Sequence, residues 1–324
     1  MHRRQLLAAI GALPIAVFAP NAWASVYPVR PIRMVVGFAP GGTADVFARL
    51  LAEFATKQLG AAVVVENKAG VAAIVGAEHV AKSAADGYTL LLSFAEALVG
   101  NPALYRQLPY KPASDFVPIA LLAQGPLVVS IGKSVPANNL SEFINHARKV
   151  DISWGSWGAG SHGHLLCAAM NRAYKLNMQH VPYKGEAPTV QGLLSGEIQI
   201  AAGSIGVMAP HLKSGALKAL GTNGAQRSLT LPQVPTLAEQ GAGGEAFTQL
   251  GWVGLVAPAN TPADIVRQWS LLVRDFLALE SARTRFLVYG FEPRFLDSVA
   301  FRKRMEDDTR VWGRLIADAG VTLD

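Results

Sequence analysis

Two glycine-rich turns in this sequence have the composition of small anion-binding sites. One contains Pro40, Gly41 and Gly42, and the other runs from Gly158 to Gly163. Each turn lies between an apolar run typical of a strand and an amphipathic run typical of a helix. Glycine lets the first backbone N–H groups of a helix converge on one point, where the helix dipole adds positive potential. Both turns therefore predict binding of a carboxylate or a similar anion, although an ordinary strand–helix connection has the same composition.

The second turn also fits the dinucleotide-binding pattern G-x-G-x-x-G. A nucleotide-binding fold would place an acidic side chain at the end of the next strand. That strand, expected at 178–181, leads into Pro182, Tyr183 and Lys184, and Glu186 follows only in the next loop. We therefore expect no nucleotide and no other cofactor.

The same turn nearly matches the nucleophile elbow of an α/β hydrolase, with Ser161 as the nucleophile. His211 could complete a triad, but the acids between them, Glu186 and Glu197, lie in a loop and at a helix end. No oxyanion motif precedes Ser161. An exported hydrolase with Ser161 as its nucleophile therefore remains an alternative and not the main prediction. Ser161 as a plain helix N-cap is compatible with an anion site.

The histidines do not form a metal-binding pattern. His162 and His164 alternate instead of sharing one helix face, and His180 and His211 lack the spacing of ligands. They are expected on the surface or at helix caps, and no metal is expected. The formal net charge of +6 comes without a Lys/Arg block interleaved with aromatic residues, so nucleic acid is not an expected partner.

The first residues have the three parts of a secretory signal peptide. Arg3 and Arg4 give a positive start, an apolar run follows, and Ala22 and Ala24 are small residues at the positions that a signal peptidase reads. We expect segment 1–24 to be removed by cleavage after Ala24. The protein would then be exported, to the periplasm if the host is Gram-negative. The apolar run is short for a membrane span, which needs about 20 residues.

Strands and helices alternate through most of the chain, which favours α/β domains built on parallel strands. Two long apolar strands are interrupted, one at Gly125-Pro126 and one within 250–258, and they bracket the central αβ pattern. We predict a discontinuous first domain, 25–124 and 250–324, and an inserted second domain, 125–249. The two hinge strands would let these domains close on a ligand. Ligands bind beyond the carboxyl ends of such strands, where the first glycine turn and Ser93 are expected.

The order of motifs resembles the extracytoplasmic solute-binding receptors of the tripartite tricarboxylate transporters, called Bug proteins. The resemblance covers the whole chain, including the expected signal peptide. The matching segments are Tyr27–Arg33, Phe38–Asp45, Val64–Asn67, Asp86–Leu90, Asn101–Tyr105, Leu108–Tyr110, Gly160–Leu165, Val181–Gly185, Pro210–His211, Leu231–Thr236 and Ala257–Pro262.

This resemblance implies a two-lobed α/β periplasmic binding protein of the Venus-flytrap type, type II-like. It would bind a small organic carboxylate, through backbone groups and water, and deliver it to a membrane permease as a monomer without catalytic residues. A receptor that reports to a sensor kinase is a further alternative. The predicted ligand-binding residues are Phe38, Ala39, Pro40, Gly41, Gly42, Asp45, Ser93, Phe94, Ser156, Trp157, Gly160, Ser161, Gly203 and Ser204.

Four departures from the family pattern bear on the ligand. Trp157 stands where a small residue is usual, and Ala202-Gly203 replaces an aromatic residue followed by Asp. Ala72-Ala73 replaces a glycine pair, and Glu96 and Ala97 replace small and hydroxyl residues. We hypothesise that Trp157 fills volume vacated at Ala202 and favours an aromatic or apolar acid; packing at the domain seam would explain it equally well. Glu96 could face solvent, carry a proton or recognise a donor group on the ligand.

Overall fold

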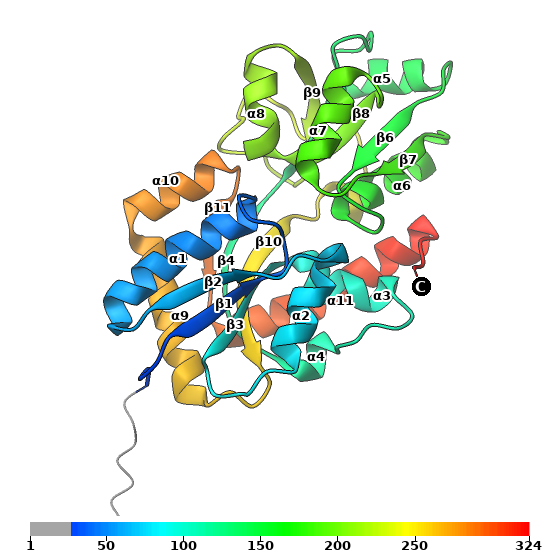
Figure 1. The fold of residues 1–324 in the computed structure, drawn as a ribbon. Coiled ribbons are helices and arrows are strands. Elements are labelled where there is room, and N and C mark those ends of the chain that lie inside the picture. Colours follow the sequence, from blue (N-terminus) through cyan, green and yellow to red (C-terminus); the bar gives the residue numbers. More distant parts are fainter. Residues whose placement is uncertain (1–26, 324) are drawn as a thin grey trace, which may run out of the picture.

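A computed structural model describes residues 27–323 and shows two α/β lobes, each built on its own sheet (Figure 1). The segment with the expected signal peptide and its cleavage site lies outside the described residues. The two-lobed α/β prediction is confirmed. The division at 25–124, 125–249 and 250–324 stays a prediction.

The first lobe contains a mixed six-stranded sheet in the order β11-β4-β10-β3-β1-β2. The strands β1, β2 and β3 are parallel, whereas β10 runs antiparallel to both β3 and β4, and β11 runs antiparallel to β4. The bounds are β1 Ile32–Val36, β2 Val63–Asn67, β3 Thr89–Phe94, β4 Phe116–Gly125, β10 Gly251–Pro258 and β11 Glu292–Leu296.

Helices cover both faces of this sheet, because its central strands alternate their apolar side chains between two cores. Met34 and Leu92 pack with Phe47 of α1, and Val35 and Leu91 pack on the opposite side. The helices α1 Thr43–Leu59, α9 Ala263–Ala278 and α10 Glu280–Val288 cover the first face. The second face is covered by α2 Ile74–Ala81, η2 Glu96–Gly100, α3 Asn101–Leu104 and α11 Ser298–Ala319; the short η1 Val71–Ala73 and α4 Pro112–Asp115 lie in connections.

The second lobe has a five-stranded sheet in the order β7-β6-β8-β5-β9. Phe143 and Leu166 contribute to the core on one face, and Val190 and Met208 to the core on the other. The strands are β5 Leu127–Gly132, β6 Ser153–Ser156, β7 Gln179–Pro182, β8 Ile200–Ser204 and β9 Leu217–Thr222. The helices are α5 Leu140–Ala147, α6 His162–Tyr174, α7 Glu186–Ser195, α8 Ile205–Lys213 and η3 Glu245–Phe247.

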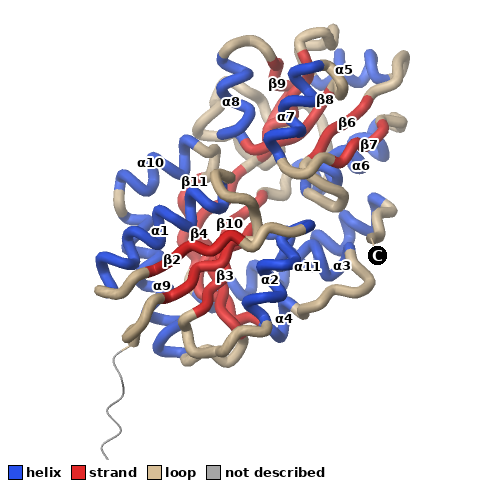
Figure 2. The backbone as a smooth tube through the Cα atoms, in the orientation of Figure 1, coloured by secondary structure: helices blue, strands red, loops and turns tan. Residues whose placement is uncertain are grey.

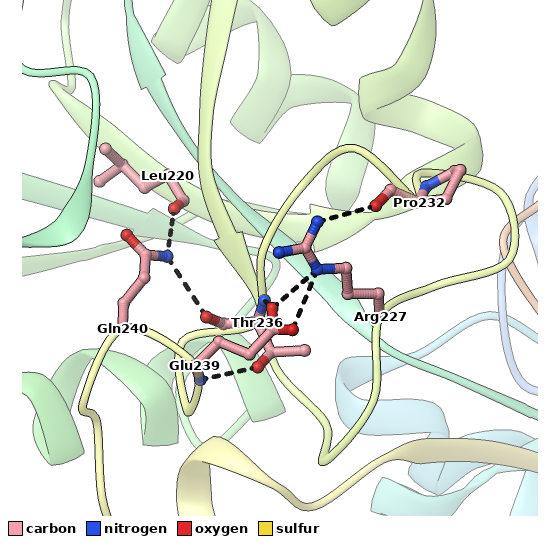
Figure 3. A network of polar contacts seen from close by, with 6 residues as sticks. All are labelled: Leu220, Arg227, Pro232, Thr236, Glu239 and Gln240. Carbon is pink, nitrogen blue, oxygen red and sulfur yellow. Dashed lines mark hydrogen bonds and ion pairs between the residues drawn. The ribbon is translucent and has the colours of Figure 1, made fainter.

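A long connection between β9 and β10 returns the chain to the first lobe, and polar contacts hold much of it in place (Figure 3). Thr236 and Glu239 cap each other, since the Glu239 carboxylate accepts from the Thr236 N–H and the Thr236 hydroxyl accepts from the Glu239 N–H. Arg227 pairs with Glu239 at 2.9 Å, and Gln240 donates to the carbonyl of Leu220 in β9. Outside η3, residues 223–250 form no helix or strand, and these contacts hold the connection in place.

The buried side chain of Asn223 joins the two segments that cross between the lobes. Its Oδ1 accepts a 2.6 Å hydrogen bond from the Leu127 N–H, and its Nδ2 donates to the Gln249 carbonyl. The same Nδ2 lies 3.3 Å from the Nε2 atom of His162, at the start of α6. Asn223 thus fixes both crossing segments relative to a turn that was predicted to bind an anion.

Three details differ from the sequence predictions. The strand at 250–258 is one continuous strand with bulges, not two, and β11 was missed because Pro293 and Arg294 hide its apolar alternation. Helix α6 begins at His162, inside the glycine turn predicted at Gly158–Gly163, which brings that histidine into the first turn. Within residues 27–323, no helix is long and apolar enough to cross a membrane.

Candidate functional site

The first glycine turn is exposed and connects β1 to α1. Gly41 has a φ of +82°, a conformation that favours glycine, and Gly42 is the N-cap of α1 without any side-chain hydrogen bond. The N–H groups of Thr43 and Ala44 have no helical partner because they lie in the first turn. The start of α1 therefore presents unpaired backbone donors next to the surface.

Asp45 already uses one donor of this turn. Its Oδ2 accepts hydrogen bonds of 2.9 Å from the Gly41 N–H and from Arg49, and its Oδ1 accepts one of 2.9 Å from Asn67. Asn67 also donates to the Phe38 carbonyl at 3.1 Å. Burial acts to raise the pKa of Asp45, but the hydrogen bonds outweigh it and lower that pKa. Asp45 therefore holds the shape of the turn.

The end of β3 lies on the same rim as the first turn, as the sequence predicted. The rings of Phe38 and Phe94 meet edge to face with centroids 5.4 Å apart. Ser93 is fully buried, and its hydroxyl has no hydrogen-bond partner within the described chain. Glu96 lies two residues after Phe94, at the start of η2, and is partly buried.

The second glycine turn is held by a short chain of hydroxyl groups. Ser161 is the N-cap of α6 and accepts from the His164 N–H at 3.3 Å. Its own hydroxyl lies 2.7 Å from the Gly158 carbonyl and 3.1 Å from the Ser156 hydroxyl. Ser156 in turn lies 2.7 Å from the Nε2 atom of His180. The hydrogen-bond partners of the Ser161 hydroxyl thus include no imidazole, which a hydrolase nucleophile would need as its base.

His162 and His164 lie at the start of α6, in agreement with the expectation of capping or surface positions; His162 is buried, and His164 and His180 are partly exposed. His164 and His180 stack with ring centroids 3.6 Å apart, and His164 Nδ1 accepts from the Gly160 N–H at 3.0 Å. Burial lowers the pKa of His180 to about 3 and that of His162 to about 4. The His162 and His180 rings are therefore neutral at ordinary pH. Between residues 27 and 323, no group of three or more His, Cys, Asp or Glu side chains could hold a metal ion.

The two lobes meet at this second turn. Gly160 packs so closely on Leu104 of α3 that a Cβ atom would lie 2.0 Å from the leucine side chain. Farther along α6, the ring of His162 lies 5.5 Å from that of Trp312 in α11. Arg172 and Asp318 form an ion pair of 2.6 Å between the same two helices. The start of α6 therefore faces the first lobe directly (Figure 2).

Two of the departures from the family pattern have clear neighbours. The Trp157 ring lies over the start of α6, because a Cβ at Gly163 would be 2.9 Å from it. The space beside Gly203 is occupied by Met208, whose methyl carbon would lie 2.7 Å from a Cβ there. Trp157 packs against the same core cluster as Ala202 and remains partly exposed.

Glu186 has a role that sequence reasoning missed. Its carboxylate accepts from the Ser204 N–H at 2.7 Å and from the Ser204 hydroxyl at 2.8 Å, so it occupies the start of α8. Burial raises the pKa of Glu186, and these two hydrogen bonds oppose the shift. No sequence signal marks the pairing, because the residues are brought together by two neighbouring strand–helix turns.

Two facing lobes with helix starts directed at the interface define a solute-binding receptor of the periplasmic binding protein class. The chain matches the tripartite tricarboxylate transporter family receptor over residues 47–321. Protein BugT of Bordetella pertussis is 33% identical over 327 residues, which covers 100% of both chains. This chain therefore belongs to the tripartite tricarboxylate transporter receptor family, as its motifs predicted.

Solved structures agree with this assignment. A protein from R. palustris with adipate has a TM-score of 0.85 to this chain at 30% identity, covering 91% of this chain and 99% of its own. MatC from Rhodopseudomonas palustris with bound malate has a TM-score of 0.80 at 31% identity, covering 90% and 100%. Both similarities extend over the two lobes.

Proposed function

We propose that this protein binds a small organic carboxylate between its lobes and delivers it to a membrane permease of the tripartite tricarboxylate type. The observation that carries the proposal is the start of α1, where no side-chain cap within residues 27–323 satisfies the first N–H groups. The start of α6 on the opposite lobe is the second anchor. Relatives with adipate and malate support the choice of a carboxylate.

The binding residues of this proposal are the fourteen predicted from the sequence, with the backbone of the two turns as the main donors. Export to the periplasm, cleavage after Ala24, the domain boundaries, a monomeric state and the lack of an enzymatic activity belong to the same proposal. The hydrolase and the sensor-kinase receptor have no observation in their favour.

A proline substitution tests the α1 site without removing the helix. Thr43 is the first helical residue, where proline fits because its missing N–H is unpaired in any case. Gly42 has an extended backbone, φ −75° and ψ 169°, which suits a residue before proline. Thr43→Pro should weaken carboxylate binding about tenfold, as for the loss of one charge-assisted hydrogen bond.

Two control variants separate this effect from others. Thr43→Ala removes the side chain but keeps the N–H, and Ala263→Pro makes the same change at the first residue of α9. Ligands would first be identified by mass spectrometry of the purified protein and then ranked by calorimetry and thermal shift. Equal binding by Thr43→Pro and Thr43→Ala would contradict the proposed role of the α1 start.

A further inference from the structure

A cavity of about 380 Å³ opens on the first lobe, and none of its lining residues belongs to the glycine turns. Its lining comes from η2, α3, the connection that leads into α4, the start of β4 and helix α11. Helices α3 and α11 lie side by side at this place (Figure 1). The volume is within the range of about 300–1,000 Å³ that is typical of small-molecule pockets. Because every lining element belongs to one lobe, the cavity does not depend on closure of the two lobes.

The floor of this cavity is apolar and held in a fixed shape. Leu98, Tyr110, Phe116 and Met305 line it and are all buried. The rings of Tyr110 and Phe116 meet edge to face with centroids 5.9 Å apart. The Tyr110 hydroxyl donates to the Ala97 carbonyl at 2.7 Å, so this polar group is already satisfied within the protein. The floor therefore offers a ligand an apolar surface.

The two sides of the cavity have different local causes. Pro102, Pro112 and Pro118 line one side, where proline lacks a backbone N–H and fixes φ, which keeps the connection irregular. The other side is one face of α11, because Met305 and Thr309 are four residues apart and lie one above the other. An irregular segment thus lies opposite a regular helix, and the space between them is the cavity.

Positive side chains from both sides also line the cavity. Lys111 comes from the connection and Arg302 from α11; both are exposed, and neither forms an ion pair within residues 27–323. Arg106 adds a third positive side chain, and Glu306 is the one acid among the lining residues. Tyr105 lines the cavity too, and its hydroxyl is buried without a hydrogen-bond partner in the described part of the chain.

An apolar floor below two unpaired cations suits a ligand with an apolar chain and a single anionic end. Burial of the chain would supply affinity, and the charges of Lys111 and Arg302 would fix the position of the head group. A dicarboxylate of similar length would bring its second charge against the apolar floor, which is unfavourable. The cavity therefore favours a monocarboxylate over a dicarboxylate.

We propose that this cavity is an accessory binding site for amphipathic monocarboxylates, with Lys111 and Arg302 as the residues that bind the carboxylate. The site is separate from the carboxylate site proposed between the lobes. The protein would thus hold two acids of different chemistry at the same time.

Calorimetry with octanoate and its neutral analogue octanamide tests the role of the two cations. The unmodified protein should bind octanoate at least about tenfold more tightly, a difference of ~1.4 kcal/mol. A double variant, Lys111→Gln with Arg302→Gln, should lower the octanoate affinity about tenfold and bring the ratio close to one. Arg267→Gln is the matched control, since Arg267 is an exposed arginine of α9, which covers the other face of the sheet.

Hydrogen exchange locates the bound acid and separates the two sites. Octanoate should slow exchange in segments 98–118 and 302–309, which contain the lining residues. Thr43→Pro, which is designed to weaken the site between the lobes, should leave octanoate binding unchanged. Protection confined to the glycine turns, an unchanged octanoate affinity in the double variant, or its loss in Thr43→Pro would overturn the accessory site alone.

Vesicles of phosphatidylglycerol distinguish a free acid from a lipid surface as the source of the same chemistry. The unmodified protein should bind octanoate and should not sediment with the vesicles. Sedimentation that the double variant abolishes, without any binding of octanoate, would overturn the free acid as the ligand.

Discussion

The carboxylate of Asp45 accepts a 2.9 Å hydrogen bond from the backbone N–H of Gly41, four residues earlier. This bond closes the β1–α1 turn on itself and uses an N–H that precedes the first helical residue, Thr43. Asp45 is 3% exposed, and Asn67 and Arg49 complete the hydrogen bonds of its side chain. The buried Asp45 carboxylate thus holds the backbone of the turn that forms part of the proposed ligand site.

Asp45→Asn should lower both the stability and the carboxylate affinity of the protein. Because the folded state lowers the pKa of Asp45, the ionised side chain stabilises the fold above its unfolded pKa of about 3.9. That stability is lost as the pH falls through the folded pKa. Chemical unfolding between pH 7 and pH 2.5 should therefore show a steeper acid loss in the unmodified protein than in Asp45→Asn.

Asp264→Asn is the matched control for this prediction. Asp264 also lies in the first turn of a helix, α9, but it is exposed and distant from the glycine turns. The same acid profile in Asp45→Asn and in the unmodified protein would show that the hydrogen bonds of Asp45 do not contribute to stability.

Trp157→Ala should change which carboxylate is preferred. The ring lies over the start of α6 and is partly exposed, so it can form an aromatic wall beside a ligand. Its removal should reduce affinity for an aromatic or apolar acid by about fivefold, corresponding to ~1 kcal/mol of aromatic contact. Calorimetry with benzoate and with a short polar acid would measure this, and an unchanged ratio of the two affinities would contradict the hypothesis.

Ala72→Gly should stabilise the protein. Ala72 has a φ of +49° and Ala73 a φ of +60°, which are left-handed conformations at the position of the family's glycine pair. Such a conformation costs an alanine about 1–2 kcal/mol, while glycine adds unfolded-state entropy of about 0.5–1 kcal/mol, so a net gain of ~0.5–1 kcal/mol is expected. Denaturant unfolding would measure it.

Ala317→Gly serves as the control because Ala317 is an exposed residue of α11 with helical geometry. This change should destabilise by up to about 1 kcal/mol. An equal loss in the free energy of unfolding for Ala72→Gly and Ala317→Gly would contradict backbone strain at Ala72.

Asp308→Ala should strongly destabilise the first lobe. The buried carboxylate accepts from the Trp252 indole N–H at 2.6 Å and from Arg304 at 2.8 Å, so it joins α11 to strand β10. Leaving both donors unpaired should cost about 2–4 kcal/mol in the free energy of unfolding. Asp307→Ala, at the next position but in exposed ion pairs, should change stability little. Comparable losses in the two variants would contradict the role of the buried bonds.

Periodicity predicted most elements of the fold, because the central strands are fully apolar and the helices have clear amphipathic faces. Met34 and Val35 on adjacent positions of β1 belong to opposite cores, as expected for a strand covered on both faces. The strand β11 could not be predicted, since it is an edge strand whose Pro293 and Arg294 interrupt any alternation. Its place is decided by pairing with β4.

The sequence by itself determined the family, the two lobes and the two glycine turns, because local composition specifies helix starts and motif order. Only the tertiary structure decided which donors remain unpaired. The Gly41 N–H is taken by Asp45 and the start of α8 by Glu186, whereas the start of α1 has no side-chain cap. The pairing of Glu186 with Ser204 was decided by tertiary packing, because a contact between two separate strand–helix turns leaves no periodic signal in the chain.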